Sequence, residues 1–261
     1  MEQNQIYNEN CLDTMSRMPD NFIDLTVTSP PYDNLRTYNG YSFDPNPIIE
    51  ELFRVTKAGG VVVWIIGDAT IKGSETGESF RQALSFKSAG FNLFDTMIYE
   101  KASRIPTQDR YYNVVEYMFV FSKGKPKALN FITDHKNITY GAVKKADAVI
   151  NKGSNIKNGK LIITPEYSRR SNIWRYGTGN NDKTGHPAVF PEKLASDHIL
   201  SWSNEGDLIY DPFMGSGTTA KMAIINNRNY IGSEISIEYC EVSEKRLHRY
   251  KNDLLTSLKY H

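Results

Sequence analysis

Short apolar runs rich in β-branched residues alternate along this chain with segments of helical spacing, and this alternation constrains the fold more than any other feature. Buried strands are predicted where such runs are short and bounded by turn residues: 23–28, 61–66, 95–99, 114–121, 207–210 and 230–233. The spacing of apolar residues predicts helices over 47–56, 79–88, 191–202 and 218–226. Alternating strands and helices predict an α/β fold with a doubly wound, mostly parallel sheet covered on both faces.

One polar, weakly periodic stretch, residues 123–185, interrupts this alternation. It carries thirteen Lys and Arg against four Asp and Glu, a net charge of +9, so the rest of a chain whose total is +1 carries −8. Such a segment either holds a nucleic-acid backbone or forms a solvated basic loop. Interleaved aromatic residues favour nucleic acid: Phe131, Tyr140, Tyr167, Trp174 and Tyr176. We therefore expect a body formed by 1–122 and 186–261, with 123–185 inserted as a recognition region.

Composition excludes several classes of protein. With 261 residues, 39% of them hydrophobic and 23% charged, the chain is neither collagen-like nor wholly disordered, and it is too short for two large independent domains. Cys11 and Cys240 form no Cys-x-x-Cys pair, so neither a disulfide framework nor a metal site is indicated. No apolar run reaches the ~18 residues of a membrane span and no secretion signal is present, so a soluble, cytoplasmic protein is expected.

A rigid loop, Ser29-Pro30-Pro31-Tyr32, follows the strand predicted over 23–28. Loops at the carboxyl ends of strands are where sheets of this type bind ligands. Both prolines lack an N–H and fix φ, so their carbonyls point in preset directions. A hydroxyl and a carbonyl can accept the two hydrogens of an exocyclic amine, while an aromatic ring stacks on the base. The loop is predicted either to bind a nucleobase amine or simply to close the strand.

A glycine-rich turn follows the strand at 207–210 and reads Asp-Pro-Phe-Met-Gly-Ser-Gly-Thr-Thr over 211–219. Glycines let the backbone come close to a ligand, and the absence of a GxxxxGK[ST] pattern argues against a nucleoside triphosphate. Glu234 ends the next predicted strand, where an acid can accept hydrogen bonds from both hydroxyls of a ribose. Without the turn, Glu234 would be a simple surface carboxylate. Together they predict a site for a small cofactor.

These two loops resemble the catalytic and cofactor motifs of the DNA amino-methyltransferases, which use S-adenosylmethionine to methylate the exocyclic nitrogen of adenine or cytosine. The resemblance rests on Thr-Ser-Pro-Pro-Tyr at 28–32 and on the turn at 211–219, and it extends to 114–124 and to His-Pro-Ala-Val-Phe-Pro-Glu at 186–192. The order of the loops is similar to that of the β class. It implies a Rossmann-like methyltransferase fold with a circularly permuted motif order, in which the cofactor strands lie beside the strands at Ile6 and Ile23.

Residue by residue, the resemblance assigns catalysis to Ser29, Pro30, Pro31 and Tyr32. It implies that the cofactor is bound by a larger set: Asn10, Cys11, Phe190, Asp211, Phe213, Gly215, Ser216, Gly217, Thr218 and Glu234. The family commonly has an acid at the position of Asn10 and often a lysine at that of Phe190, so this chain departs from the pattern there. Within the insert, lysines such as Lys144 and Lys145 are expected to meet phosphates, and Arg169, Arg170 and Arg175 to contact guanine edges.

The expected substrate is double-stranded DNA. An amine inside a duplex is reached by turning its nucleotide out of the stack, which costs a few kcal/mol, and stacking on Tyr32 can offset much of that cost. The methyl group would pass directly to the amine, because no Pro-Cys nucleophile is present. Asp68, at the end of the strand predicted over 61–66, either lines the target pocket or forms a turn.

Ser29 and the form of residues 186–191 resemble the cytosine-N4 subgroup, so N4 of cytosine is favoured over N6 of adenine. Three alternatives stay open: adenine-N6 methylation, a catalytically inactive DNA-binding regulator, and methylation of RNA or a protein amide. As partners, the resemblance suggests a cognate restriction endonuclease in a restriction–modification system and a second copy of the chain in a homodimer.

Overall fold

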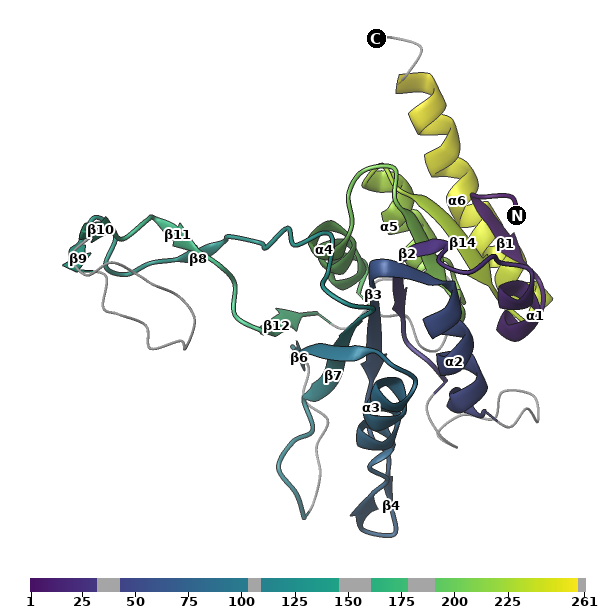
Figure 1. Cartoon of the computed structure of the whole chain (residues 1–261), viewed down its shortest axis with the longest axis horizontal. Helices are drawn as coiled ribbons and strands as arrows, with labels where there is room; N and C mark the ends of the chain where they lie inside the picture. The colour runs from purple at the N-terminus through teal and green to yellow at the C-terminus, as the bar shows by residue number, and fades with distance from the viewer. Residues whose placement is uncertain (32–42, 103–108, 146–160, 178–190, 258–261) are drawn as a thin grey trace. The chain divides into compact units, whose positions relative to one another are not determined.

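The computed structural model describes residues 1–31, 43–102, 109–145, 161–177 and 191–257. The chain forms two compact units (Figure 1). Unit 1 comprises Met1–Asn130 together with Asn172–His261, and unit 2 comprises Phe131–Ser171. No helix among the described residues is long and apolar enough to cross a membrane.

An eight-stranded sheet forms the centre of unit 1. Its strands follow one another across the sheet in the order β1 (Gln5–Tyr7), β14 (Asn229–Ser233), β13 (Leu208–Asp211), β2 (Ile23–Thr28), β3 (Thr56–Ile66), β7 (Val115–Ser122), β6 (Asn92–Lys101) and β12 (Ile173–Tyr176). Each neighbouring pair is parallel except those that involve β7, which is antiparallel to both β3 and β6. The predicted doubly wound, mostly parallel α/β fold is confirmed.

The described part of unit 1 contains the helices α1 (Cys11–Ser16), α2 (Pro45–Val55), α3 (Glu78–Ser88), α4 (Glu192–Trp202), α5 (Thr218–Ile225) and α6 (Ile237–Ser257). Local signals explain two of their starts. Asp44 precedes α2 and accepts a hydrogen bond from the Asn46 N–H at 3.0 Å. Asp68, ten residues before α3, also holds its first turn, because it accepts from the Ser79 N–H at 3.0 Å and from both the Ser79 and Thr76 hydroxyls. These bonds give Asp68 a structural role, although the structure assigns no turn to it.

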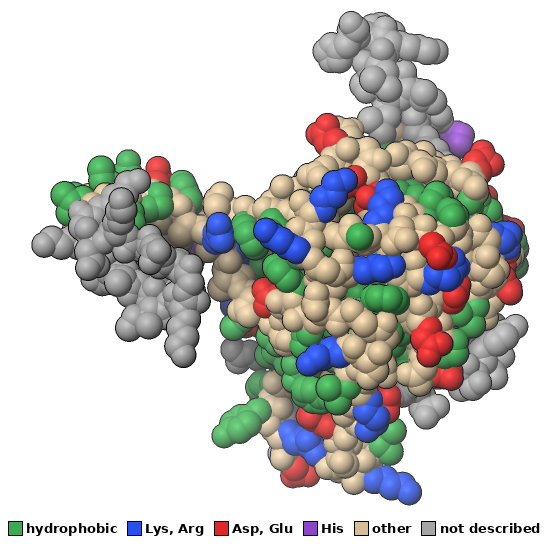
Figure 2. Space-filling view, viewed as in Figure 1, with side chains coloured by type: hydrophobic (Ala, Val, Ile, Leu, Met, Phe, Trp, Pro, Cys, Tyr) green, Lys and Arg blue, Asp and Glu red, His purple; other side chains and the backbone are tan. Residues whose placement is uncertain are grey.

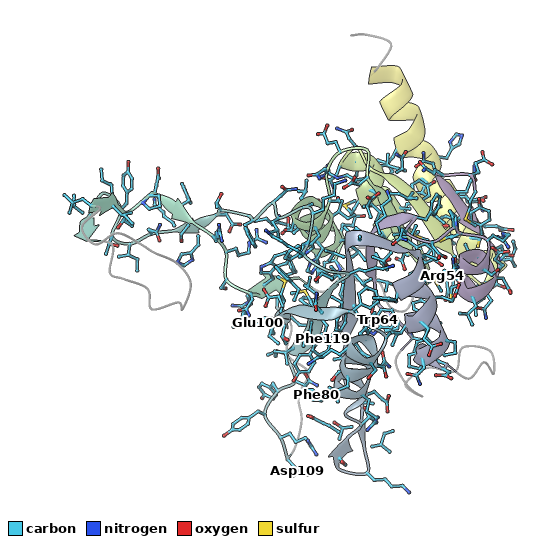
Figure 3. All side chains as sticks on the ribbon, in the orientation of Figure 1. Arg54, Trp64, Phe80, Glu100, Asp109 and Phe119 are labelled. Atoms are coloured by element: carbon cyan, nitrogen blue, oxygen red, sulfur yellow. The ribbon has the colours of Figure 1, made fainter. Side chains whose placement is uncertain are left out.

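The core lies on both faces of the central strands. Residues 61–66 of β3 are all buried, and because successive side chains of a strand alternate between faces, both faces are covered. On one face, α1, α2 and α3 contribute to a single cluster around Trp64 (Figure 3). Trp64 packs edge-on against Phe86 at 5.1 Å between ring centroids and donates to Gln82 at 2.8 Å. Contacts of α4 with β2, and of α5 with β13 and β14, hold the carboxyl-terminal helices to the same sheet.

The last strand of the sheet corrects one prediction. β12 pairs in parallel with β6 in unit 1, although it falls within the range predicted as the insert. Trp174 is only 5% exposed and packs against the His198 ring, and Tyr176 is 8% exposed and donates to Asp197 at 2.7 Å. Buried rings cannot stack on bases, so the predicted nucleic-acid role of these two aromatic residues is wrong.

Two short antiparallel ladders make up the regular structure described in unit 2. β8 (His135–Lys136) pairs with β11 (Tyr167–Ser168), and β9 (Val143–Lys145) pairs with β10 (Leu161–Ile163). Hydrophobic side chains gather at the β9–β10 end of the unit (Figure 2), where all three residues of β10 are exposed. Outside the main sheet, unit 1 contains one further hairpin, β4 (Thr70–Ile71) and β5 (Ser74–Glu75).

Candidate active site

The predicted catalytic loop and the predicted cofactor turn begin side by side, because β2 and β13 are neighbours in the sheet. β2 ends at Thr28 and β13 ends at Asp211, and the Thr28 hydroxyl donates to Asp211 Oδ1 at 2.6 Å. β1 and β14 complete this half of the sheet, so the strands at Ile6 and Ile23 do lie beside the cofactor strands. The permuted strand order is therefore confirmed, and both loops leave the same edge of the sheet.

The catalytic loop starts in the protein interior and then approaches the surface. Thr28 is fully buried, Ser29 is half-buried, Pro30 is buried again and Pro31 is half-buried. Tyr32 lies outside the described residues, as does Phe190. The roles assigned to both side chains stay predictions.

The Asp211 carboxylate is the most enclosed acid of the site, with 1% exposure. Oδ1 accepts from the Thr28 hydroxyl and from the Phe213 N–H at 3.0 Å, and Oδ2 accepts from the Thr219 hydroxyl at 2.7 Å. Burial raises the pKa of this carboxyl to about 6, even though these three hydrogen bonds favour the charged form. Both oxygens are thus occupied by groups of the chain itself.

The turn between β13 and α5 needs glycine at two positions. Gly215 has φ 52° and Gly217 has φ 82°, the left-handed region that residues with a Cβ rarely adopt. A Cβ on Gly217 would also lie 2.9 Å from the Cβ of Ser243 on α6. Close packing against α6 therefore explains this glycine without a ligand, whereas the sequence suggested a close approach to the cofactor.

Phe213 opens the turn and is half-buried. Its ring packs edge-on against Trp64 at 6.0 Å and against Phe43 at 5.6 Å between centroids. These contacts connect the turn to the cluster around Trp64. They hold the backbone of the turn at the carboxyl ends of the strands. The remainder of the ring's surface can contact a ligand.

Ser216 and Thr218 are buried and face a side chain of α6. Arg246 donates from Nη1 to the Ser216 carbonyl at 2.9 Å, to the Ser216 hydroxyl at 3.1 Å and to the Thr218 hydroxyl at 3.3 Å. Its Nη2 donates to Glu192 at 2.6 Å, and Lys221 pairs with the same carboxylate. Burial acts to raise the pKa of Glu192, but the bonds from Lys221 and Arg246 outweigh it and lower that pKa. The two hydroxyls therefore contact α6, and their predicted contacts with the cofactor stay a prediction.

Glu234 lies just beyond β14, at the same sheet edge as the turn. Its carboxylate accepts from the Gly215 N–H and from the Ser236 N–H, both at 2.8 Å. Burial raises the pKa of Glu234, against the effect of these hydrogen bonds. Next to it, Ile235 is 49% exposed, a large apolar side chain in water beside a half-buried carboxylate. An acid and an apolar surface side by side suit the ribose and base of a nucleoside.

The first helix accounts for Asn10 and Cys11 without a ligand. Asn10 precedes α1, and its side chain accepts from the Leu12 N–H at 2.9 Å, as an N-cap does. Cys11 is 5% exposed and belongs to the core cluster, and burial raises the pKa of its thiol to about 12. A contact between Cys11 and a cofactor would thus come from its backbone, since the thiol faces the core.

The residues predicted to contact DNA are divided between the two units. Arg169 and Arg170 belong to unit 2, where Arg169 lies 4.2 Å from the centroid of Phe131 and Arg170 pairs with Asp134. Lys144 and Lys145 lie on β9, and their side chains are outside the described part of the structure. Arg175 belongs to unit 1, on β12, 3.9 Å from Glu100 of β6. Its predicted place in the insert is therefore wrong.

Comparison with known proteins identifies the family. A family model described as a DNA methylase matches residues 23–245. The chain belongs to this DNA methylase family. The orphan methyltransferase M.BamHII of Bacillus amyloliquefaciens is 59% identical over 237 residues, which cover 87% of this methylase and 89% of the relative. The type II methyltransferase M.BglII of Bacillus subtilis is 28% identical over 250 residues, which cover 92% of this chain and 68% of the relative.

Solved structures share the fold of this methylase. The PvuII DNA methyltransferase, a cytosine-N4-specific enzyme, superimposes with a TM-score of 0.69 at 21% identity, covering 98% of this chain and 94% of its own. M1.HpyAVI in complex with S-adenosylmethionine superimposes with a TM-score of 0.59 at 22% identity. The match covers 93% of this chain and 98% of the M1.HpyAVI chain. The predicted methyltransferase fold is thus confirmed. Family membership confirms the predicted enzyme class, a DNA methyltransferase that uses S-adenosylmethionine.

Three contributors to this methylase's site were missed from its sequence. Thr28 and Thr219 hold Asp211 from two different elements, and Arg246 holds the turn from α6. Thr28 and Thr219 stand inside the motifs that carry the family resemblance, which is the only signal the sequence offers for them. Arg246 lies 30 residues beyond Ser216, and no local pattern singles it out from the other charged residues of its helix.

Proposed function

We propose that this DNA methylase transfers a methyl group from S-adenosylmethionine to N4 of a cytosine that is turned out of duplex DNA. The observation that supports this most is the hydrogen bond between Thr28 and Asp211, because it joins the start of the catalytic loop to the start of the cofactor turn. Serine at position 29 and the cytosine-N4 specificity of the PvuII enzyme favour cytosine over adenine.

In this proposal the catalytic loop orients the amine. The lone pair of an exocyclic amine is delocalised into its ring, so acceptors for its two hydrogens hold it in place and strengthen it as a nucleophile. The Ser29 hydroxyl and a proline carbonyl are the proposed acceptors, held by a loop that is buried at Pro30. Positioning of this kind can supply roughly 7–11 kcal/mol of the barrier reduction. Tyr32 is the proposed stacking partner of the base.

The cofactor is proposed to lie at the carboxyl ends of β13 and β14. When bound, S-adenosylmethionine supplies a methyl group activated by a positively charged sulfur. Glu234 would accept hydrogen bonds from its ribose, Ile235 offers apolar surface for its base, and the turn that begins at Phe213 would hold its methionine part. The residues fit such a group, because an acid, an exposed apolar side chain and a glycine turn meet at one edge.

Unit 2 is the proposed DNA-recognition region, in place of the wider range 123–185. Its sequence holds eight Lys and Arg against three Asp and Glu, a net charge of +5. Arg169 is exposed with its guanidinium over the Phe131 ring, which leaves edge N–H groups for a phosphate or a base. The lysines of β9 add positive charge to the β9–β10 ladder.

The base is identified by incubating the protein with unmethylated duplex DNA and isotopically labelled S-adenosylmethionine, followed by nucleoside digestion and mass spectrometry. Labelled N4-methylcytosine is the expected product, and Ser29→Ala is expected to lower the rate at least tenfold. N6-methyladenine alone would establish the adenine alternative. Label in RNA or protein but not in DNA, or DNA binding without any transfer, would contradict the proposal.

DNA recognition is tested by comparing Arg169→Ala with Lys87→Ala, which removes one exposed positive charge from α3 of unit 1. We expect Arg169→Ala to weaken binding of a cognate duplex about tenfold, the size of a lost arginine contact, and Lys87→Ala to change it less than twofold. Equal effects would show that only net charge matters.

Base flipping is tested with 2-aminopurine placed at the target position of the duplex. Its fluorescence should increase when the wild type binds but not when Tyr32→Ala binds, and an unchanged increase in the variant would reject the stacking role.

The names of the relatives bear on the proposed partners. M.BamHII is called an orphan methyltransferase, whereas M.BglII is a type II methyltransferase. A restriction endonuclease gene beside the gene for this chain, whose product cuts unmethylated but not methylated DNA, would establish a restriction–modification role. Light scattering of the purified protein would give about 60 kDa for the proposed homodimer and 29.7 kDa for a single chain.

A further inference from the structure

The Asp211 carboxylate occupies an unusual place for a group expected to touch a cofactor. It is 1% exposed, and its two oxygens accept three hydrogen bonds from the chain itself. An ionised carboxylate donates no hydrogen bond, so further polar contacts would require donors that reach an enclosed atom. The side chain is therefore better suited to hold other parts of the protein than to bind a ligand.

The three donors come from three different segments of the site. Thr28 ends the strand that leads into Ser29, the Phe213 N–H belongs to the cofactor turn, and Thr219 lies in the first turn of α5. The Thr219 hydroxyl also lies 3.2 Å from the Val27 carbonyl on β2. One buried carboxylate thus connects the catalytic strand, the cofactor turn and the helix that follows it.

The sheet itself does not make this connection. The register between β13 and β2 pairs Ile209 with Leu25 and Tyr210 with Thr26, and it ends there. Thr28 lies two residues beyond the last pair. The Thr28–Asp211 hydrogen bond therefore extends the link between the two strands beyond their backbone pairing, up to the residue that precedes Ser29.

From this arrangement we infer that Asp211 is a positioning residue that sets the distance between the catalytic loop and the bound methyl donor. The inference rests on the proposed function, because it assumes that Ser29 orients the amine and that the turn holds the cofactor. A methyl transfer between two groups carried by separate loops depends steeply on their separation. A displacement of about 1 Å can cost about 100-fold in rate, even when both groups still bind.

The strand provides a matched pair of variants for the test. Thr28→Val removes the hydroxyl that reaches Asp211, with little change in volume. Thr26→Val makes the same change two residues earlier on the same strand, where the Thr26 hydroxyl is buried and has no hydrogen-bond partner among the described residues. Thr28→Ser shortens the side chain but keeps the donor. Each variant is compared with the wild type in cofactor affinity, by calorimetry, and in the rate of a single turnover on duplex DNA.

We expect Thr28→Val to lower the single-turnover rate at least tenfold while its cofactor Kd stays within threefold of the wild type. Thr26→Val should stay within twofold in both, and Thr28→Ser should recover most of the lost rate. The inference is overturned if Thr28→Val, folded, is as fast as Thr26→Val. It is also overturned if the cofactor Kd rises in proportion to the loss of rate, because Asp211 would then serve binding, or if Thr28→Ser is as slow as Thr28→Val.

Circular dichroism and thermal unfolding establish that each variant is folded. If Thr28→Val is unfolded, Thr219→Val removes the other hydroxyl donor and carries the same expectations. If neither valine variant folds, the network serves the fold alone and the positioning role is rejected. Failure of the proposed function is a separate result, because it would appear as a wild type that transfers no methyl group to cytosine in DNA.

Discussion

Replacing Asp211 by asparagine should change how the stability of the protein depends on pH. Burial raises the pKa of this carboxyl to about 6, from an ordinary value of 3.8. Between these two pH values the folded state holds a proton that the unfolded state has lost. The free energy of unfolding therefore falls as the pH rises from 3.8 to about 6, and above that range this carboxyl no longer changes it. At 1.36 kcal/mol per pKa unit, the charged carboxylate lowers stability by about 3 kcal/mol at neutral pH.

Asparagine has nearly the same shape and does not titrate. Its carbonyl can accept from Thr28, and its amide can donate to the Thr219 hydroxyl, which is free to turn toward the Val27 carbonyl. We therefore expect the stability of Asp211→Asn, relative to the wild type, to rise by about 2.4 kcal/mol between pH 4 and pH 7, since part of the change is complete at pH 4. Urea unfolding of both proteins at half-unit steps of pH measures this difference. A difference that is constant with pH, or that falls, would refute the reasoning.

Three further substitutions test individual contacts. Gly217→Ala should lower the free energy of unfolding by about 2 kcal/mol in urea titrations, because it strains a left-handed φ and meets Ser243; an unchanged midpoint would contradict the packing described. Arg246→Met should weaken S-adenosylmethionine binding roughly tenfold in calorimetry by loosening the turn at Ser216, and an unaltered Kd would show that the turn holds its shape alone. Thr26→Val should raise stability by about 1 kcal/mol, since the Thr26 hydroxyl is buried without a hydrogen-bond partner in the part of the chain that the structure describes, and a loss of stability would contradict this.

Most of the fold could be predicted from local patterns, because buried strands are conspicuous in the sequence. The strand predicted over 23–28 has those bounds in the structure, and the one predicted over 61–66 lies within β3, which begins earlier at Thr56. The polar start of β3, with Gly59 and Gly60, hides its first half from a hydrophobicity argument. A run of apolar residues predicts only the buried part of a strand, whereas the backbone pairing of β3 extends beyond that part.

β12 was missed for a different reason. Its residues 173–176 alternate between exposed and buried, the period of a strand with one buried face. Four residues are too few for a convincing pattern, and the basic stretch around them suggested a solvated segment. In such a stretch the aromatic residues Trp174 and Tyr176 resemble stacking partners for bases, although their alternation with exposed residues favours the sheet.

The sequence motifs predict the parts of the site that lie within them. The order of the two loops, together with the family resemblance, placed them on neighbouring strands, and the structure agrees. The partners of Asp211 could not be derived in this way. Thr28 is 183 residues away from Asp211, and a hydrogen bond over that separation depends on the register of the sheet, which no local pattern encodes. Composition and spacing therefore indicated which residues matter but left open whether each one touches a ligand or supports another residue.

The position of β2 in the sheet also affects how the chain folds as it is synthesised. β3, its neighbour on one side, starts at residue 56, whereas β13, its neighbour on the other, starts at residue 208, which is 180 positions after Thr28. At about 5–20 residues per second, one edge of β2 waits about 10–40 s on the ribosome for its partner. During that time an apolar strand presents unpaired N–H and C=O groups to other chains, so the nascent protein depends on shielding of this edge until about the last fifth of the 261 residues emerges.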